Sequence, residues 1–152
     1  MACRPPRSNK LYHMEPPQSH CARPGHGLIA GIMDNEREQG SKFLPKFDAA
    51  GLLAAIVTDA GDGAVLMLGY MNQSAYDATR ATGLVHFYSR SRDRLWQKGE
   101  SSGNVLRVED IHIDCDQDAL LIIASPAGPT CHTGERSCFY RRVAEDGSLQ
   151  RI

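Results

Sequence analysis

The sequence lacks the features that place a protein in a membrane, outside the cell or on nucleic acid. Its 17 Lys and Arg residues are balanced by 18 Asp and Glu, which leaves no surplus of positive charge for phosphate-rich partners. The longest apolar run, residues 51–57, is far shorter than the roughly 20 residues that span a bilayer. The amino terminus has no continuous apolar core of the secretory type. We therefore expect a cytoplasmic protein that binds neither nucleic acid nor membranes.

Cysteine is scarce and is not arranged as in redox proteins. The chain has five cysteines, an odd number, and no two of them form a C-x-x-C pair. A cytoplasmic chain with reduced thiols and an odd cysteine count does not fit a disulfide framework. Metal binding or catalysis therefore remains as the informative role for these cysteines, and a thiol redox module is the least favoured interpretation.

Composition divides the chain into an amino-terminal extension and a domain. Residues 1–40 hold five of the eight prolines and show no sustained strand or helix period, so we expect them to be disordered. Residues 41–152 then form one domain. Residues 1–47 carry seven basic and four acidic residues, whereas residues 48–152 carry ten and fourteen, so the negative charge belongs to the domain.

Hydrophobic patterning within the domain predicts many strands and few helices. Two apolar stretches, residues 52–58 and 64–70, flank the Gly-rich residues 59–63, which is typical of a hairpin. Asn72 or Ser74 can cap a helix that runs to Arg80, and Gly83 can end it. Further strands are expected over residues 84–89, 105–113, 120–124 and 138–143. The predicted fold class is α+β with a mixed or largely antiparallel sheet.

Carboxylates recur at every second position in one acidic segment, at Asp114, Asp116 and Asp118. In an extended segment they would share one face, with backbone positions about 6.5 to 7 Å apart, and a divalent cation would relieve their repulsion. The same alternation would point Cys115 to the opposite face. An EF-hand does not fit, because Ala119 stands where that loop needs glycine. A solvated acidic turn is the alternative that needs no metal.

A loop rich in glycine and proline, residues 126–138, carries Cys131 and Cys138. The loop can fold back so that both sulfurs reach one ion, and Cys115 would add a third thiolate. Three protein ligands with one open position are typical of a catalytic zinc site. His132 could either complete a closed Cys₃His site, which would be structural, or stand beside an open site and handle protons. Inert buried thiols are the alternative.

Residues 89–104 combine arginines, the single tryptophan, a lysine and two glycines that frame hydroxyl and amide side chains. Guanidinium groups and backbone amides can hold phosphate, and an aromatic plane can stack on a base. The stretch does not match a Walker loop, and a solvated charged loop is the alternative. The candidate substrate-binding residues are Arg90, Arg92, Trp96, Lys98, Glu100, Ser102 and Asn104.

Three motifs in this order, LWQKGESSGN, IDCDQDALL and PAGPTCHTGERSCF, resemble the phosphoribosyl-AMP cyclohydrolases. The similarity extends from about Phe47 to Phe139. It implies a stand-alone enzyme of histidine biosynthesis that opens the adenine ring of 1-(5-phosphoribosyl)-AMP. A zinc-activated water would hydrolyse the N1–C6 bond in the third step of the pathway and give the phosphoribosyl-formimino-AICAR-phosphate intermediate.

The resemblance also implies roles for individual residues. Magnesium would be bound by Asp114, Asp116 and Asp118. One zinc per subunit would be bound by Cys115, Cys131 and Cys138, with Cys115 of one subunit meeting the other two cysteines of its partner in a homodimer. The resemblance further implies that His132 takes part in catalysis.

Two other functions would use similar residues. A base deaminase also activates water with zinc, but it needs H-x-E and P-C-x-x-C motifs. Here six residues separate Cys131 from Cys138, and neither His112 nor His132 has Glu two positions later. A non-catalytic interaction module would hold zinc with the same thiols in a closed four-ligand site. An exchangeable metal-bound water would distinguish the enzyme from this module.

Overall fold

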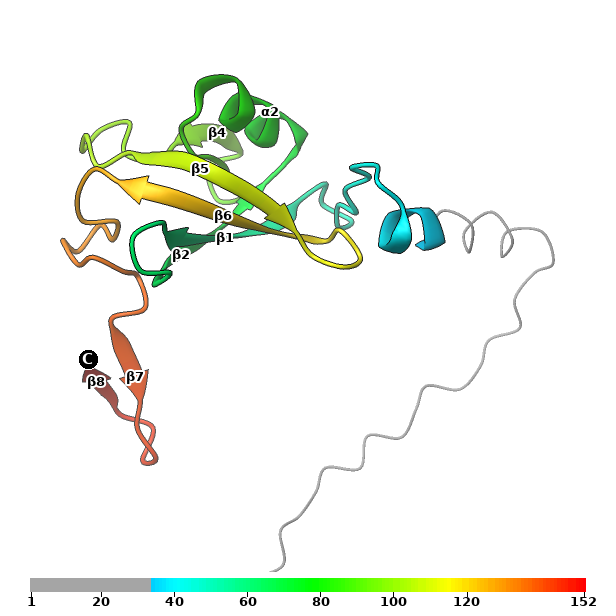
Figure 1. The fold of residues 1–152 in the computed structure, drawn as a ribbon. Coiled ribbons are helices and arrows are strands. Elements are labelled where there is room, and N and C mark those ends of the chain that lie inside the picture. The colour runs from blue at the N-terminus through cyan, green and yellow to red at the C-terminus, as the bar shows by residue number, and fades with distance from the viewer. Residues whose placement is uncertain (1–33) are drawn as a thin grey trace, which may run out of the picture.

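The computed structural model describes residues 34–152, which are coloured from cyan to red in Figure 1. We expect residues 1–40 to form a disordered extension, and residues 1–33 of it lie outside the described residues. Residues 34–39 are helical, and the Arg37 carbonyl oxygen accepts a hydrogen bond from the Gln117 side chain at 2.7 Å. Contacts with the domain therefore begin before residue 41, while the extension itself stays a prediction.

A four-stranded mixed sheet forms the centre of the domain, in the order β2-β1-β6-β5. Strand β1 (Leu53–Asp59) pairs antiparallel with β2 (Val65–Met71), which confirms the predicted hairpin. Strand β1 also pairs parallel with β6 (Ala119–Pro126), and β5 (Leu106–Ile113) pairs antiparallel with β6. This mixed sheet, accompanied by few helices in residues 34–152, confirms the α+β class.

Helix α2 (Gln73–Thr82) begins and ends at residues that the sequence indicates. The Asn72 side chain accepts a hydrogen bond from the Ala75 amide at 2.9 Å, which satisfies an otherwise unpaired donor of the first turn. Gly83 has φ +68°, a left-handed conformation that glycine adopts without strain, and its amide bonds back to Thr79. No helix in the described residues is long and apolar enough to cross a bilayer.

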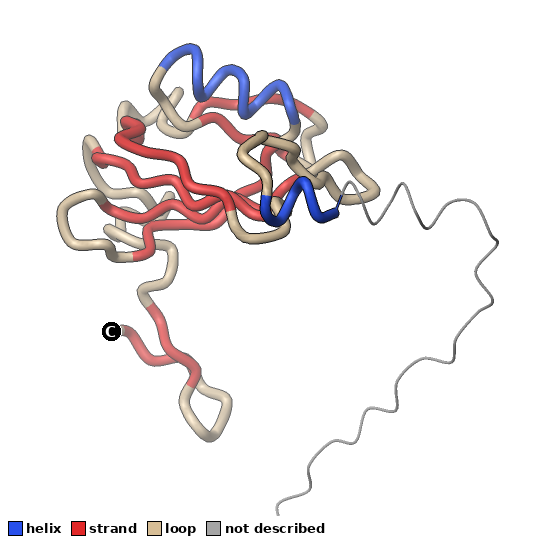
Figure 2. Tube along the Cα trace, turned by 45° about the vertical axis from the view of Figure 1, so that its right-hand side comes forward, coloured by secondary structure: helices blue, strands red, loops and turns tan. Residues whose placement is uncertain are grey.

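The core lies between one face of the sheet and a layer made by α2 and β3 (His86–Ser89). Buried and half-buried side chains alternate along β1 and β6, so the two strands turn one face to this core. Phe87 of β3 packs directly over Gly69 of β2, where an added Cβ would lie 2.4 Å from the ring. Figure 2 shows α2 on one side of the sheet. The opposite face has no helix or strand of the described chain over it.

Two short hairpins complete the fold and differ from the prediction. Strand β4 (Arg94–Gln97) pairs with β3 inside a stretch for which no strand was predicted, because Trp96 packs on Phe87 with ring centroids 5.4 Å apart. The strand expected over residues 138–143 is wrong in its first half. Only Arg141–Val143 form β7, which pairs with β8 (Leu149–Arg151), because the Cys138 amide bonds to Leu66 O at the edge of β2.

Candidate active site

A cleft of about 460 Å³ brings together nine predicted site residues from two segments that are far apart in sequence. One wall comes from β4 and the loop after it, and the other comes from the cysteine loop that follows β6. The predicted residues that line it are Arg92, Trp96, Lys98, Glu100, Ser102, Asn104, Cys131, His132 and Cys138. Thiols, an imidazole, an amine and an aromatic ring therefore share one opening.

Two glycines shape the first wall. Gly99 and Gly103 have φ of +86° and +76°, and the Gly103 amide donates a hydrogen bond to the Gly99 carbonyl oxygen, which closes the loop. The turn holds Lys98 against the cleft with only 9% of its surface exposed, and its Nζ donates to the Asn104 carbonyl oxygen at 3.3 Å. Burial lowers the pKa of Lys98 because the charged ammonium loses hydration.

Hydrogen bonds and an ion pair attach the cysteine loop to the β1–β2 hairpin. The Cys138 amide donates to the Leu66 carbonyl oxygen at 2.8 Å. The Arg136 guanidinium reaches the Asp59 carboxylate at 2.6 Å and the Asp62 carboxylate at 2.7 Å. These bonds lower the pKa of both aspartates, with the hydrogen bond from Arg136 as the main cause. The position of the thiols therefore depends on a hairpin more than 70 residues earlier in the chain.

The two thiols in the cleft have opposite pKa shifts. Cys131 is buried, and the Thr133 hydroxyl donates a hydrogen bond to its sulfur at 3.0 Å, which lowers the pKa of this thiol. Although Cys138 has exposed surface, the protein around its sulfur raises the pKa of the thiol to about 11, and the neighbouring Cys131 adds to this effect. A cation would stabilise both thiolates, so this donor pair fits a thiophilic metal such as zinc.

Two further side chains complete the second wall. His132 is exposed, and its Nδ1 lies 3.9 Å from the Cys131 sulfur, so the ring stands at the opening beside the thiols. Thr130 is 2% exposed, and its hydroxyl has no hydrogen-bond partner among the described residues. Burying a hydroxyl without a hydrogen-bond partner costs folding free energy. Thr130 also lines the cleft, although the sequence patterns did not single it out.

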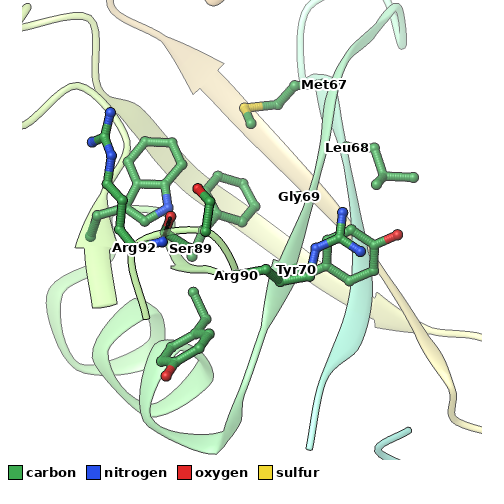
Figure 3. A pocket seen from close by; sticks show the side chains of 11 residues that line it. Met67, Leu68, Gly69, Tyr70, Ser89, Arg90 and Arg92 are labelled. Atoms are coloured by element: carbon green, nitrogen blue, oxygen red, sulfur yellow. Dashed lines mark hydrogen bonds between the residues drawn. The ribbon is translucent and has the colours of Figure 1, made fainter. Parts of the chain in front are cut away.

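A second and larger cleft, of about 830 Å³, adjoins the first and shares Met67, Arg92 and Trp96 with it. Arg90 lies in this second cleft and not among the cysteines. Its guanidinium carbon is 3.9 Å from the centroid of the Tyr70 ring, and Figure 3 shows the two side chains together beside β2. The basic residues of the predicted substrate stretch are thus distributed along two joined clefts.

The three aspartates come together, but in a turn and not in an extended strand. Residues 114–118 connect β5 to β6, and ligand oxygens of Asp114, Asp116 and Asp118 lie within 4.8 Å of one another. Of the two conformations that the sequence left open, an extended segment and an acidic turn, the structure has the turn, because the Asp114 carboxylate accepts hydrogen bonds from the Asp118 and Ala119 amides and closes it. The charge of Asp116 raises the pKa of Asp118.

Cys115 is separated from the other two candidate thiols within one chain. It lies in the turn before β6, whereas Cys131 and Cys138 lie in the loop after β6, and Figure 1 shows these loops at opposite ends of the strand. The eight residues of β6 correspond to about 26 Å at ~3.3 Å per residue. A site that contains all three thiols therefore needs two chains.

Gln117 is a structural residue that the sequence patterns also missed. Its side chain accepts a hydrogen bond from the Leu44 amide at 2.6 Å and donates to the Arg37 and Lys42 carbonyl oxygens. Lys46 adds an ion pair with Asp116 at 2.8 Å. Residues 37–46 are therefore bound to the acidic turn. A polar residue between aspartates is the only sequence signal, and it does not reveal partners 70 or more positions away.

Comparison with known proteins agrees with this arrangement. The sequence profile of a family described as Phosphoribosyl-AMP cyclohydrolase matches residues 67–140, which include both the acidic turn and the cysteine loop. A phosphoribosyl-AMP cyclohydrolase of Sphingopyxis alaskensis is 61% identical over 117 residues, which cover 77% of this chain and 93% of the relative. Its counterpart in Rhizorhabdus wittichii is 62% identical over 115 residues, which cover 76% and 93%.

A third relative extends this similarity to another genus. The phosphoribosyl-AMP cyclohydrolase of Sinorhizobium medicae is 58% identical over 120 residues, which cover 78% of this chain and 80% of the relative. The resemblance that rests on the three motifs is thus confirmed by relatives that cover 76 to 78% of this chain. This chain belongs to the phosphoribosyl-AMP cyclohydrolase family.

Proposed function

We propose that this chain hydrolyses the N1–C6 bond of 1-(5-phosphoribosyl)-AMP, a ring-opening step of histidine biosynthesis. The observation that carries the proposal is the cleft in which Cys131, Cys138 and His132 face Lys98 and Trp96. Three relatives named phosphoribosyl-AMP cyclohydrolase are 58 to 62% identical to this chain over the aligned residues. The adjoining cleft gives room for a ligand longer than a mononucleotide.

The reaction balances with water as the only co-reactant. The water oxygen bonds to C6 of the adenine ring, and the N1–C6 bond then breaks. The oxygen remains on C6, which becomes a carboxamide carbon because it keeps its amino group. N1 stays attached to C2 and to the phosphoribosyl group, and no ammonia leaves. One proton of the water must therefore move away from the attacking oxygen, and N1 must be the leaving nitrogen.

The thiols support zinc as the metal of this cleft. The hydrogen bond from Thr133 prepares Cys131 to ionise, and a cation would offset the raised pKa of Cys138. When bound, zinc supplies Lewis acidity that activates a water for attack. Three thiolates donate much negative charge to such a metal and weaken its Lewis acidity. A nearby base is therefore needed to take the proton of the water. His132 lies at the opening beside Cys131 and is the residue to accept the water's proton.

The remaining cleft residues would bind the substrate. Trp96 offers a ring for the base, and Lys98 offers a positive charge that is already desolvated. Arg92 and Arg90 are placed to hold phosphate in the adjoining cleft. Glu100 already pairs with Arg94 at 2.8 Å, so it also positions the loop. Ser102 and Asn104 supply hydroxyl and amide groups at the rim of the cleft.

Magnesium would fit the acidic turn. The carboxylates of Asp114, Asp116 and Asp118 are close enough to share one hard cation. Lys46 forms an ion pair with Asp116, whereas Asp114 and Asp118 form no ion pair with any residue of the described range 34–152. A bound magnesium would neutralise this face and allow a doubly phosphorylated substrate to approach.

A homodimer would complete the site, because the separated cysteines must come from two subunits. Purified Cys115→Ser and Cys131→Ser variants should each lack activity, followed as the ultraviolet change on ring opening of phosphoribosyl-AMP. After subunit exchange, half of the dimers should be mixed, and each mixed dimer holds one intact set of thiols, so about a quarter of wild-type activity should return. Chelator treatment should remove this recovered activity.

A control and a contrary outcome define this test. Mixing Cys131→Ser with Cys138→Ser should restore nothing, because no intact set forms. Recovery in that control, or full activity of Cys115→Ser alone, would contradict a shared site. Zinc-loaded wild-type protein that leaves phosphoribosyl-AMP unchanged would favour a non-catalytic zinc-binding module instead.

A further inference from the structure

We infer that Gln117 is a positioning residue for the acidic turn, residues 114–118, because it fastens residues 37–46 to that turn and fixes the turn before a metal binds. We call residues 37–46 the strap. The inference rests on the proposed function for the magnesium that the turn would hold, and it adds what keeps the carboxylates together. Three observations carry it: the burial of the Gln117 side chain, its left-handed backbone and its hydrogen bonds to the strap.

The Gln117 side chain is buried and fully used, although it stands in a segment of aspartates. Only 4% of the residue is exposed. Its Oε1 accepts a hydrogen bond from the Leu44 amide at 2.6 Å, and its Nε2 donates to the Arg37 and Lys42 carbonyl oxygens at 2.7 and 3.1 Å. Both N–H groups of the side-chain amide are therefore paired. A buried polar group with all its donors paired specifies one arrangement, so the strap and the turn fix each other's position.

The Gln117 backbone supports the same conclusion. It has φ +59°, in the left-handed region that residues other than glycine adopt at a cost. Such a conformation persists where the surroundings over-determine it. Here the Gln117 carbonyl oxygen accepts a hydrogen bond from the Lys46 amide at 2.7 Å, and the Gln117 amide donates to the Asp114 carbonyl oxygen at 3.3 Å. The strap thus bonds to both the side chain and the main chain of the residue that closes the turn.

The acidic turn needs such a support because its carboxylates repel one another. Oxygens of the three aspartates lie within 4.8 Å of one another, and like charges this close disfavour the arrangement. The strap also supplies a counter-charge, since the Lys46 Nζ lies 2.8 Å from the Asp116 carboxylate. Without the strap we expect the carboxylates to separate. Part of the binding free energy of a metal would then be used to gather them again.

The strap is also attached to the helical layer, so it is more than a loose segment over the turn. Phe43 stacks on Tyr76 of α2, with ring centroids 4.7 Å apart and ring planes at 22°. Within the strap, the Arg37 Nε donates a hydrogen bond to the Leu44 carbonyl oxygen at 3.0 Å. Figure 1 shows this segment, in cyan, beside the yellow loop between β5 and β6. The turn is thereby connected through the strap to α2.

Coupling between strap and metal must act in both directions. If fastening by Gln117 favours magnesium binding, bound magnesium stabilises the fastened strap by the same factor, because coupling free energies are reciprocal. A residue that only stabilises the fold has neither effect. Its loss lowers the free energy of unfolding and leaves the magnesium affinity of the folded chain unchanged.

Magnesium titration by calorimetry of the full-length purified protein tests the first direction. Gln117→Asn keeps an amide and a residue that tolerates the left-handed conformation, but its shorter side chain cannot reach all three strap groups. The Kd for magnesium should rise by about 10-fold, at the lower end of what losing an outer-shell partner of a metal site costs. The magnesium concentration for half-maximal turnover should rise by the same factor. The matched control is Gln150→Asn on β8, whose side chain bonds Arg142; its Kd should stay at the wild-type value.

Hydrogen exchange tests the second direction without reference to activity. In the wild type, saturating magnesium should slow exchange of the Leu44 and Lys46 amides, which donate to the Gln117 side chain and main chain. The slowing should reach up to the same factor of about 10. In Gln117→Asn, magnesium should no longer slow exchange of the Leu44 amide.

Circular dichroism shows whether the variants fold, and Gln117→Gly, which relieves the left-handed backbone, is the second variant if Gln117→Asn does not. A wild-type Kd for magnesium in a folded Gln117 variant would overturn the positioning role, and so would strap exchange that ignores magnesium in the wild type. Wild-type protein that binds no magnesium would overturn it too. Neither result affects ring opening at the thiol cleft. Protein that shows the coupling but leaves phosphoribosyl-AMP unchanged would instead contradict the proposed function and keep the role of Gln117.

Discussion

Gly99 gives the sharpest test of how the first wall of the cleft is built. At φ +86° an alanine is strained, and its Cβ would lie 2.5 Å from the Asn104 carbonyl carbon and oxygen and 2.6 Å from the Val105 amide nitrogen. These atoms belong to the backbone and cannot rotate away. Gly99→Ala should therefore destabilise the domain through left-handed strain and through overpacking, and it should push the loop with Asn104 out of the cleft.

Gly103→Ala separates the cost of left-handed strain from the cost of overpacking, because Gly103 has φ +76° but no atom within 4 Å of an added Cβ. Left-handed strain costs about 1–2 kcal/mol, and the stiffer unfolded chain returns about 0.4–1 kcal/mol, so this control should lose about 1 kcal/mol. Overpacking adds about 1–3 kcal/mol for Gly99→Ala. With a urea m-value of about 1.5 kcal/mol per molar, the two midpoints should differ by roughly 1 M.

Urea unfolding of both variants at one protein concentration is the assay, because an oligomer's midpoint depends on concentration. Turnover of phosphoribosyl-AMP should fall in Gly99→Ala and stay near wild type in Gly103→Ala, since only the first displaces the backbone beside Lys98. Equal midpoints for the two variants would refute the claim that backbone contact, and not φ alone, requires glycine at residue 99.

Two further predictions follow from the second wall. His132→Ala should give folded, zinc-loaded protein whose turnover falls by about 10²- to 10⁴-fold; metal analysis with kinetics measures this, and unchanged turnover would exclude His132 as the base. Arg136→Gln should destabilise the domain near neutral pH but not in acid, because the pKa values of Asp59 and Asp62 are lowered in the folded chain. That stabilisation is present above their ordinary pKa of 3.8 and is lost as the pH falls through the lowered values, so an unfolding difference that is equal at pH 7 and pH 3 would contradict it.

Local patterns were sufficient to predict the elements that bury one face. Leu53, Ala55 and Val57 repeat at every second position, and the capping residues Asn72 and Gly83 mark the ends of α2. Strand β4 could not be predicted in this way, because Arg94–Gln97 has only four residues and two of them are polar. Its stability comes from Trp96 packing on Phe87, a contact between side chains and not a pattern along the chain.

The candidate site was predictable in its residue types but not in its geometry. Cys131, His132 and Cys138 are close in sequence, and the cleft indeed holds them together. The spacing of the aspartates left open whether they lie in an extended segment or in a turn, and the structure gathers them in a turn. The ion pair of Arg136 with Asp59 joins residues that are distant in sequence, so local patterns cannot predict it. The same is true of the hydrogen bond from the Gln117 side chain to the Arg37 carbonyl oxygen.

A single strand sets the spacing between the two halves of the proposed zinc site. Strand β6 is a central strand, paired on both sides and buried at Leu120, Ile122 and Ala124, so the distance between its end loops cannot adjust. In the proposed dimer, dissociation of the subunits would break both zinc sites at once. Only the dimer would offer zinc all three thiol ligands, because the free chain cannot bring them together. By mass action each site at a free zinc concentration of 100 Kd would stabilise the dimer by about 2.7 kcal/mol. Assembly and metal loading would therefore be coupled.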